Sequence, residues 1–177
     1  MDVDCIIGID PGASGGIVSW RPNTNTKAIK MPKDINDIKE YIEYYKEIAK
    51  PIVFLEKLTV RPDDIADGNM GKIYRIQKML QNYEQLKAIL TIIGVPFVLV
   101  HPMKWQNELR LRKKLENKAD RKKRYKEVAS NLYPDVKVTM WNADALLIMH
   151  FGRYALVNIP DWVRQNVPTN VYNKIWK

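Results

Sequence analysis

The strongest constraint on the fold is a stretch near the amino terminus in which a mostly apolar run ends on a carboxylate. Residues 3–10 lead to Asp10, Pro11-Gly12 forms a turn signal, and a second apolar run begins at Gly16. This pattern predicts a buried central strand, a tight reversal and an antiparallel partner strand. Asp10 is therefore expected at the carboxyl end of a core strand, where α/β sheets commonly place their chemistry. By itself, Asp10 is equally consistent with an ordinary turn residue.

The remaining apolar runs extend this pattern into an ordered set of strands and helices. Short continuous runs bounded by turn residues predict strands, and apolar residues at helical spacing predict helices. The expected strands are 3–10, 16–20, 27–31, 52–56 and 97–100, and the expected helices are 35–50, 73–94, 102–115, 118–132 and 142–156. Three consecutive strands favour an antiparallel meander, and strands separated by helices favour parallel crossovers. The predicted fold class is α/β, a mixed five-stranded sheet flanked by helices.

The chain is predicted to form one domain. Its 177 residues can bury a sizeable core but do not divide comfortably into two cores. We assign residues 1–157 to the domain and residues 158–177 to a carboxy-terminal tail that packs on it. The acidic first residues lack the basic segment of a signal peptide, and the single cysteine, Cys5, cannot form an internal disulfide. These features predict a cytoplasmic protein that does not enter a membrane.

The positive charge of the chain is concentrated in one segment. The formal net charge is +9, and eleven of the 29 Lys and Arg residues lie between Lys104 and Lys126, where three acidic residues accompany them. A solvated helix face is the ordinary explanation for a charged run, but this run is too one-sided in sign for that explanation. The excess instead indicates a polyanionic partner, and nucleic acid is the first candidate.

Two further acidic residues resemble Asp10 in their setting. Glu56 ends the apolar run 52–55, and parallel neighbouring strands would bring it beside Asp10, because such strands lie about 4.8 Å apart. Carboxylates this close repel each other unless one is protonated or a cation lies between them, and oxygen ligands favour Mg²⁺ or Mn²⁺. Asp144 heads the apolar stripe of the last helix and therefore points toward the sheet. Its alternative role is a first-turn aspartate that complements the helix dipole.

Three acidic motifs, in this order and spacing, resemble those of RuvC-type Holliday junction resolvases in the RNase H-like superfamily. They are Ile9-Asp10-Pro11-Gly12, Phe54-Leu55-Glu56-Lys57 and Ala143-Asp144-Ala145-Leu146-Leu147-Ile148. Shorter agreements are Asn82-Tyr83-Glu84, Pro102-Met103-Lys104-Trp105 and Asn117-Lys118. The resemblance spans roughly residues 5–155 and is closest to the short RuvC-like nucleases of phages.

The resemblance implies an RNase H-like fold, a homodimer, and nicking of Holliday junctions or other branched DNA, in the host cytoplasm if the gene belongs to a phage. Asp10, Glu56 and Asp144 would be ligands of Mg²⁺, with Mn²⁺ as a substitute, and two ions would flank the scissile phosphate and activate water. RuvC proteins commonly carry a fourth acidic or histidine ligand one turn before the helical aspartate. Trp141 stands there, and Asn142 is the alternative ligand through its amide oxygen, so the second ion is left open.

The expected DNA contacts come from basic residues and from one loop. Lys118 lies seven residues before Tyr125 on the apolar stripe of the 118–132 helix, so its ammonium is expected to reach toward the sheet. The resemblance supports Lys118 as a catalytic residue that meets the scissile phosphate. After the second acidic motif, Leu58 and Met70 are the apolar candidates for insertion at a branch point. The expected DNA-binding residues are Lys104, Arg112, Lys113, Lys114, Lys118, Arg121, Lys122 and Arg124.

Other functions fit parts of this pattern. An actin-like or Hsp70-like phosphotransferase also has an Asp-x-Gly hairpin, but its second phosphate loop and its Gly-Gly adenosine site are missing from the sequence. Two alternatives stay open beside the resolvase. One is a branched-DNA-binding protein without catalysis, and the other is a less selective RNase H-like nuclease that acts on flaps, forks or hybrids.

Overall fold

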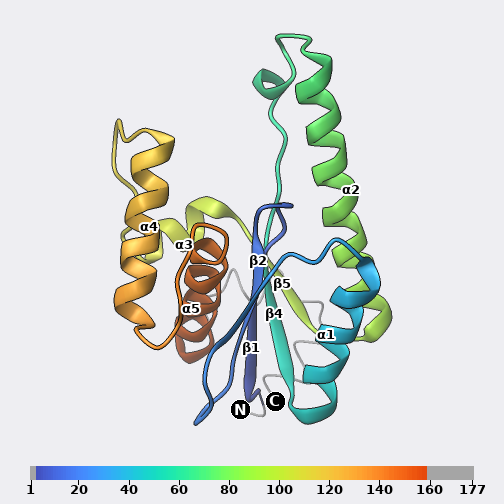
Figure 1. Ribbon diagram of the computed structural model, residues 1–177, viewed down its shortest axis with the longest axis vertical. Coiled ribbons are helices and arrows are strands. Elements are labelled where there is room, and N and C mark those ends of the chain that lie inside the picture. The colour runs from blue at the N-terminus through green and yellow to red at the C-terminus, as the bar shows by residue number, and fades with distance from the viewer. Residues whose placement is uncertain (1–2, 159–177) are drawn as a thin grey trace.

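The sheet has the strand order β3-β2-β1-β4-β5 in the computed structural model, which describes residues 3–158 (Figure 1). The strands are β1 (Cys5–Asp10), β2 (Gly16–Trp20), β3 (Lys27–Lys30), β4 (Pro51–Glu56) and β5 (Phe97–Val100). The helices are α1 (Ile35–Ile48), a 3₁₀ turn η1 (Pro62–Asp64), α2 (Met70–Ile93), α3 (Pro102–Glu108), α4 (Lys118–Leu132) and α5 (Ala143–Asn158). Residues 159–177, which make up nearly all of the predicted tail, lie outside the described residues. Within the described part, no helix is long and apolar enough to cross a membrane.

The central strand β1 has neighbours of both orientations. It runs antiparallel to β2 and parallel to β4, and the register places Ile9 opposite Leu55 and Asp10 opposite Gly16. On the outer sides of the sheet, β3 pairs antiparallel with β2, and β5 pairs parallel with β4. This arrangement confirms the predicted α/β class with a mixed five-stranded sheet.

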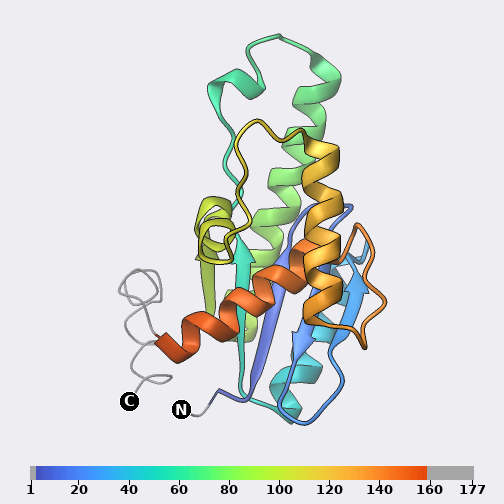
Figure 2. The ribbon, with the colours of Figure 1, turned by 90° about the vertical axis from the view of Figure 1, so that its left-hand side faces the viewer.

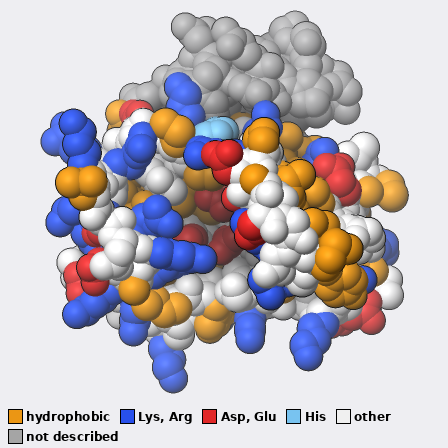
Figure 3. All heavy atoms as spheres, turned by 90° about the horizontal axis from the view of Figure 1, so that it is seen from above, with side chains coloured by type: hydrophobic (Ala, Val, Ile, Leu, Met, Phe, Trp, Pro, Cys, Tyr) orange, Lys and Arg blue, Asp and Glu red, His pale blue; other side chains and the backbone are white. Residues whose placement is uncertain are grey.

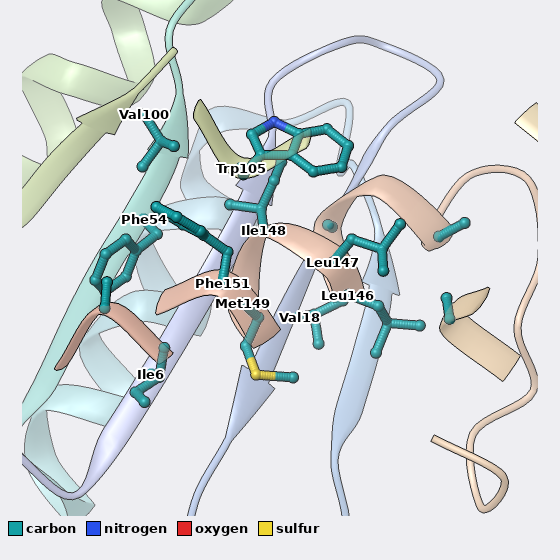
Figure 4. Close-up of a cluster of buried hydrophobic side chains, with 14 of the residues drawn as sticks. Ile6, Val18, Phe54, Val100, Trp105, Leu146, Leu147, Ile148, Met149 and Phe151 are labelled. Carbon is teal, nitrogen blue, oxygen red and sulfur yellow. The ribbon is translucent and has the colours of Figure 1, made fainter. Parts of the chain in front are cut away.

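Helices cover both faces of the sheet. α1 and α2 pack on one face, and α3, α4 and α5 lie on the other (Figures 1 and 2). Successive residues of β1 serve different faces, because Ile7 belongs to the core beneath α1 and α2 whereas Ile6 belongs to the core beneath α5. Figure 4 shows the second core, in which Phe54 of β4 meets Phe151 of α5 edge to face with 6.3 Å between ring centroids.

A glycine in β1 allows α5 to lie directly on the sheet. A Cβ at Gly8 would be 2.4 Å from the carbonyl oxygen of Ala145 and 2.5 Å from the backbone nitrogen of Met149. Any larger residue would push the helix away from the strand, because a packed interior has no room to give. The close approach therefore keeps the first turn of α5, which carries Asp144, near the end of β1.

Three helices begin directly after a capping residue in the sequence. Each capping side chain accepts a hydrogen bond from a backbone N–H in the first turn of its helix. Asp34 caps α1 at 2.8 Å, Asn69 caps α2 at 3.0 Å, and Asn117 caps α4 at 2.9 Å. Gly94 ends α2 in the left-handed conformation, at a φ of 72°. Because Asn69 is a cap, α2 begins at Met70, earlier than the predicted start at residue 73.

The prediction of a basic helix over 102–115 is wrong, because the helix in the structure is shorter. α3 ends at Glu108, and residues 109–117 form an irregular connection. Trp105 and Leu111 are both buried in the core beneath α5, yet six residues apart on one continuous helix they would face different sides. Ending the helix early lets both side chains reach the same core.

Candidate metal and nucleic-acid site

Three carboxylates lie at the edge of the sheet where β1 and β4 end. Asp10 and Glu56 are the last residues of these adjacent parallel strands, directly after the paired residues Ile9 and Leu55. Asp144 is the second residue of α5, is 8% exposed, and exerts its charge on both of the other acids. We call Asp10, Glu56 and Asp144 the carboxylate edge.

Burial and mutual repulsion make the carboxylate edge difficult to ionise. Burial, together with the charge of Asp144, raises the pKa of Asp10 to about 6. Burial, together with the charge of Asp10, raises the pKa of Glu56 to about 8, although a hydrogen bond from Trp105 acts in the opposite direction. Acids shifted in this way favour either a proton or a bound cation. Such shifts in a cleft are typical of functional sites.

The Pro11-Gly12 turn shapes the surroundings of Asp10. The backbone N–H of Gly12 donates a hydrogen bond to Asp10 Oδ1 at 3.2 Å. A Cβ at Gly15 would lie 2.4 Å from the backbone carbonyl oxygen of Asp10 and 2.8 Å from its Oδ2. A side chain at position 15 would therefore collide with the carboxyl group, so the turn both orients Asp10 and leaves space around it.

Glu56 is held by Trp105, which in the sequence stands out only as part of the Pro102-Met103-Lys104-Trp105 motif. Trp105 is completely buried, and its Nε1–H donates to Glu56 Oε1 at 3.0 Å. Its ring packs edge-on against Tyr125 with 5.4 Å between centroids. A buried indole N–H usually finds an acceptor, so the sequence could have indicated that Trp105 has a polar partner, but not that the partner is Glu56.

Asp144 forms an ion pair with Lys122, whose ammonium contacts its Oδ2. The Lys122 side chain is 33% exposed. Burial lowers the pKa of Lys122, but the charges of Asp144, Asp10 and Glu56 outweigh that effect and raise it overall. Lys122 is therefore a basic side chain that interacts with all three members of the carboxylate edge.

Lys118 does not reach the sheet, and the predicted orientation of its side chain is wrong. It is the first residue of α4 and is exposed. The first turn of α4 projects beyond the edge of the sheet (Figure 2). Lys122 lies one turn later, where α4 passes the start of α5, and so it takes the position expected for Lys118.

The structure also contradicts Asn142 as a metal ligand. Its amide oxygen accepts hydrogen bonds from the backbone N–H of Thr139 at 2.7 Å and from the Thr139 hydroxyl at 3.2 Å, and its amide nitrogen donates to the Lys137 carbonyl at 3.1 Å. Both amide atoms are therefore used in the turn before α5. Trp141 packs over Gly16, where a Cβ would be 2.8 Å from the indole ring. Neither Trp141 nor Asn142 supplies an oxygen to the carboxylate edge.

The donor atoms of the carboxylate edge fit a hard divalent cation in their chemistry. All three side chains offer carboxylate oxygens, the ligands that Mg²⁺ and Mn²⁺ prefer, and Asp144 Oδ1 is buried without a hydrogen-bond partner. However, the described residues contain no group of three or more His, Cys, Asp or Glu side chains that is placed to hold an ion. Asp144 is paired with the Lys122 ammonium instead. The ligands are suitable but not assembled.

A cleft of about 440 Å³ opens beside the carboxylate edge. Figure 3 shows acidic side chains at the bottom of a hollow, with basic side chains gathered along its margin. Its lining includes Glu56, Asp144 and the following: Thr59, Arg61, His101, Pro102, Met103, Gln106, Arg112, Lys113, Glu116, Arg121, Lys122 and Tyr125. We call Arg112, Lys113 and Arg121 the basic wall. Arg61 and His101 were not expected here, because Arg61 lies far from the basic segment in the sequence and His101 lies just before it.

The other predicted DNA-binding residues lie outside this cleft. Lys104 is exposed on α3, and Lys114 and Lys118 are exposed at the connection before α4 and at its first residue. Arg124 is engaged with Glu116 through two hydrogen bonds, one of them 2.7 Å long, and both side chains are largely buried, at 15% and 12% exposed. In this structure the guanidinium of Arg124 anchors the 109–117 connection to α4, and its contact with DNA stays a prediction.

The two apolar candidates for insertion have different surroundings. Leu58 is half-buried against the core beneath α1 and α2, so it is not available as a wedge. Met70 is 75% exposed at the start of α2, near exposed Ile65 and Tyr74 at 46% and 59%. This end of α2 projects beyond the sheet (Figure 1).

The architecture is that of the RuvC/RNase H-like fold: a mixed five-stranded sheet with helices on both faces and acids at the ends of its central strands. Thermus thermophilus RuvC, solved in complex with a Holliday junction substrate, is similar to this chain at a TM-score of 0.53 and 14% identity, with 88% of this chain and 96% of that chain covered. Another structure of Thermus thermophilus RuvC gives a TM-score of 0.53 and 15% identity, covering 92% and 98%. No protein-family model matches the sequence, and no curated protein matches it significantly. At these identities the likeness establishes the fold.

Proposed function

We propose that this protein is a metal-dependent endodeoxyribonuclease that nicks Holliday junctions or other branched DNA. The observation that carries the proposal is the position of Asp10, Glu56 and Asp144 beside a basic cleft in a RuvC-like fold. The RuvC solved with a Holliday junction substrate supports the choice of branched DNA as the substrate.

Each acid is positioned for a ligand role by a different part of the fold. Asp10 is oriented by the Gly12 N–H, Glu56 by the Trp105 indole, and Asp144 by the packing of α5 on β1. When bound, Mg²⁺ or Mn²⁺ supplies Lewis-acid chemistry, which includes activating water for attack on the phosphate. Asp10, Glu56 and Asp144 would hold the ion, and no protein side chain would need to act as a nucleophile.

The basic side chains of the cleft neutralise and position the DNA backbone. Arg112, Lys113 and Arg121 line the cleft and fit contacts to phosphates on either side of the scissile one. Lys122, rather than Lys118, contacts the scissile phosphate in this proposal, because its ammonium lies at the carboxylate edge. The planar guanidinium of Arg121 can donate two parallel hydrogen bonds to one phosphate, whereas the Lys122 ammonium acts as a point charge.

A four-way junction has two-fold symmetry, and paired nicks require two active sites. We therefore propose a homodimer, since a closed two-fold assembly presents two equal sites to two equal strands. The likeness to short phage nucleases belongs to the same proposal, with the host cytoplasm as the site of action.

The decisive experiment incubates the protein with a strand-labelled four-way junction and Mg²⁺. We expect nicks near the branch point, and we expect Asp10→Asn to bind the junction with similar affinity but to cleave on the order of 10³-fold more slowly. A linear duplex of the same sequence serves as the control substrate, and flaps and forks measure selectivity. Tight junction binding without nicks would instead establish the non-catalytic binding protein.

A further inference from the structure

Lys122 occupies one side of the carboxylate edge. Its ammonium contacts Asp144 Oδ2, while Oδ1 of the same carboxylate is buried and has no hydrogen-bond partner. Its charge acts on Asp10 and Glu56 as well. A divalent ion held by Asp10, Glu56 and Asp144 would share the Asp144 carboxylate with the ammonium. Two cations bound to one carboxylate repel each other.

We propose that Lys122 competes with the metal ion for Asp144 in the DNA-free protein, and that DNA relieves this competition by drawing the ammonium to a backbone phosphate. The inference rests on the proposed function, because it takes the same carboxylates as metal ligands. It assigns to one lysine the coupling between DNA binding and assembly of the metal site.

The surroundings of Lys122 allow both positions of its side chain. It is held at Asp144, but a third of the side chain is exposed and it lines the cleft beside Arg121. The four-carbon stem of a lysine lets the ammonium turn toward the cleft without movement of α4. A phosphate in the cleft then offers the ammonium a second anionic partner.

The competition accounts for the unassembled ligand set. Among the described residues, no three acidic side chains stand in position to hold an ion, although three carboxylates lie at one edge. With the ammonium withdrawn, Asp144 offers two free carboxylate oxygens. By linkage, DNA must then tighten metal binding by the same factor by which metal tightens DNA binding, so the ion is held firmly only when DNA is seated.

The first test measures binding of Mn²⁺ alone to the DNA-free protein by calorimetry. Lys122→Gln is expected to bind Mn²⁺ at least about tenfold more tightly than wild type, a factor that corresponds to about 1.4 kcal/mol. Lys123→Gln is the matched control, because it removes the same charge from an exposed position of the same helix, and its affinity should stay within about twofold. Lys122→Met, checked for a native unfolding transition, repeats the test with the stem retained. Unchanged Mn²⁺ affinity in both Lys122 variants overturns the inference.

The second test measures binding of a linear duplex with and without Mn²⁺ at constant ionic strength. Mn²⁺ should tighten duplex binding in wild type and in Lys123→Gln, and much less in Lys122→Gln. An equal effect of Mn²⁺ in all three proteins contradicts the competition. Neither test requires cleavage. A wild type that shows this coupling but does not nick a junction overturns the nuclease alone, and one that nicks without the coupling overturns this inference alone.

Discussion

The carboxylate edge, through Glu56 and Asp144, and the basic wall line the same cleft but are held in different ways. Each acid of the edge is positioned by the sheet or by a helix packed on it, and each makes a specific bond: Gly12 to Asp10, Trp105 to Glu56, and Lys122 to Asp144. The basic wall lies on the irregular 109–117 connection and the first turns of α4. The Glu116–Arg124 ion pair ties that connection to the helix.

This difference suits the two ligands proposed for these regions, a metal ion for the edge and a DNA backbone for the wall. A metal ion requires several oxygens at fixed positions, so its ligands come from rigid elements. A phosphate backbone presents a spread-out charge, and long basic side chains on a loop can follow it. Three predictions test whether the edge and the wall are separable in this way, ordered from the largest expected effect to the smallest.

The edge should destabilise the metal-free protein as the pH rises. The pKa of Asp10 is raised to about 6 and that of Glu56 to about 8. At a pH between the ordinary pKa of each acid and its raised pKa, the folded state therefore binds more protons than the unfolded state. Stability therefore falls as pH increases from about 4 to about 8, by roughly 2–3 kcal/mol for Asp10 alone. Urea unfolding in the presence of a chelator measures this slope.

Asp10→Asn should make that profile less steep, because the amide does not titrate and only Glu56, whose pKa is raised mainly by burial, still contributes. Glu127→Gln, at an exposed position of α4, is the control and should leave the slope unchanged. A wild-type profile that rises between pH 5 and pH 8 would contradict the charge repulsion at the edge.

The indole of Trp105 should matter through its N–H more than through its ring. Trp105→Phe keeps an aromatic ring in the core but removes the donor to Glu56 Oε1. We expect Mn²⁺ affinity in the presence of DNA to fall about tenfold, since a charge-assisted hydrogen bond contributes roughly 1.5–3 kcal/mol. Calorimetry measures the affinity.

Trp20→Phe is the matched control for that change, because Trp20 lies at the opposite end of β2 from the site and contacts Arg153. It should leave Mn²⁺ affinity unchanged. Equal losses in the two variants would mean that Trp105 acts through general stability rather than through Glu56.

The wall should affect DNA binding through charge alone. Replacing Arg112 and Lys113 together with Gln removes two phosphate contacts, so the slope of log affinity against log salt should become shallower by about 1.8. Fluorescence anisotropy with a junction at several salt concentrations measures the slope. The control is the double change of Lys123 and Lys126 to Gln, at exposed positions of α4. An equal change in slope in the control would show that the cleft is not the DNA path.

Much of this structure could be predicted because the relevant signals are local. Apolar runs indicated the strands β1, β2, β4 and β5, and the predicted starts of α1 and α4 at residues 35 and 118 agree with the structure. The acids at the ends of β1 and β4 followed from the same runs. The length of α3 could not be predicted, because it depends on Trp105 and Leu111 reaching one core formed with distant parts of the chain.

The partners of the acids also required the structure. Lys118 and Lys122 are one turn apart on the same helix, and only the offset of α4 along α5 decides which ammonium meets Asp144. Arg124 is one more positive charge in the sequence, but Glu116 folds back across eight positions to pair with it. Asn142 resembled a ligand until its amide was seen to bond within its own turn.

The sequence by itself determined the strands, their order along the chain and the acids at their ends, because apolar periodicity acts over a few residues. Only the tertiary structure decided that Trp105 bonds to Glu56, that Lys122 pairs with Asp144, and that Arg124 pairs with Glu116. Such pairings join residues 8 to 49 positions apart, and they depend on how helices pack on the sheet.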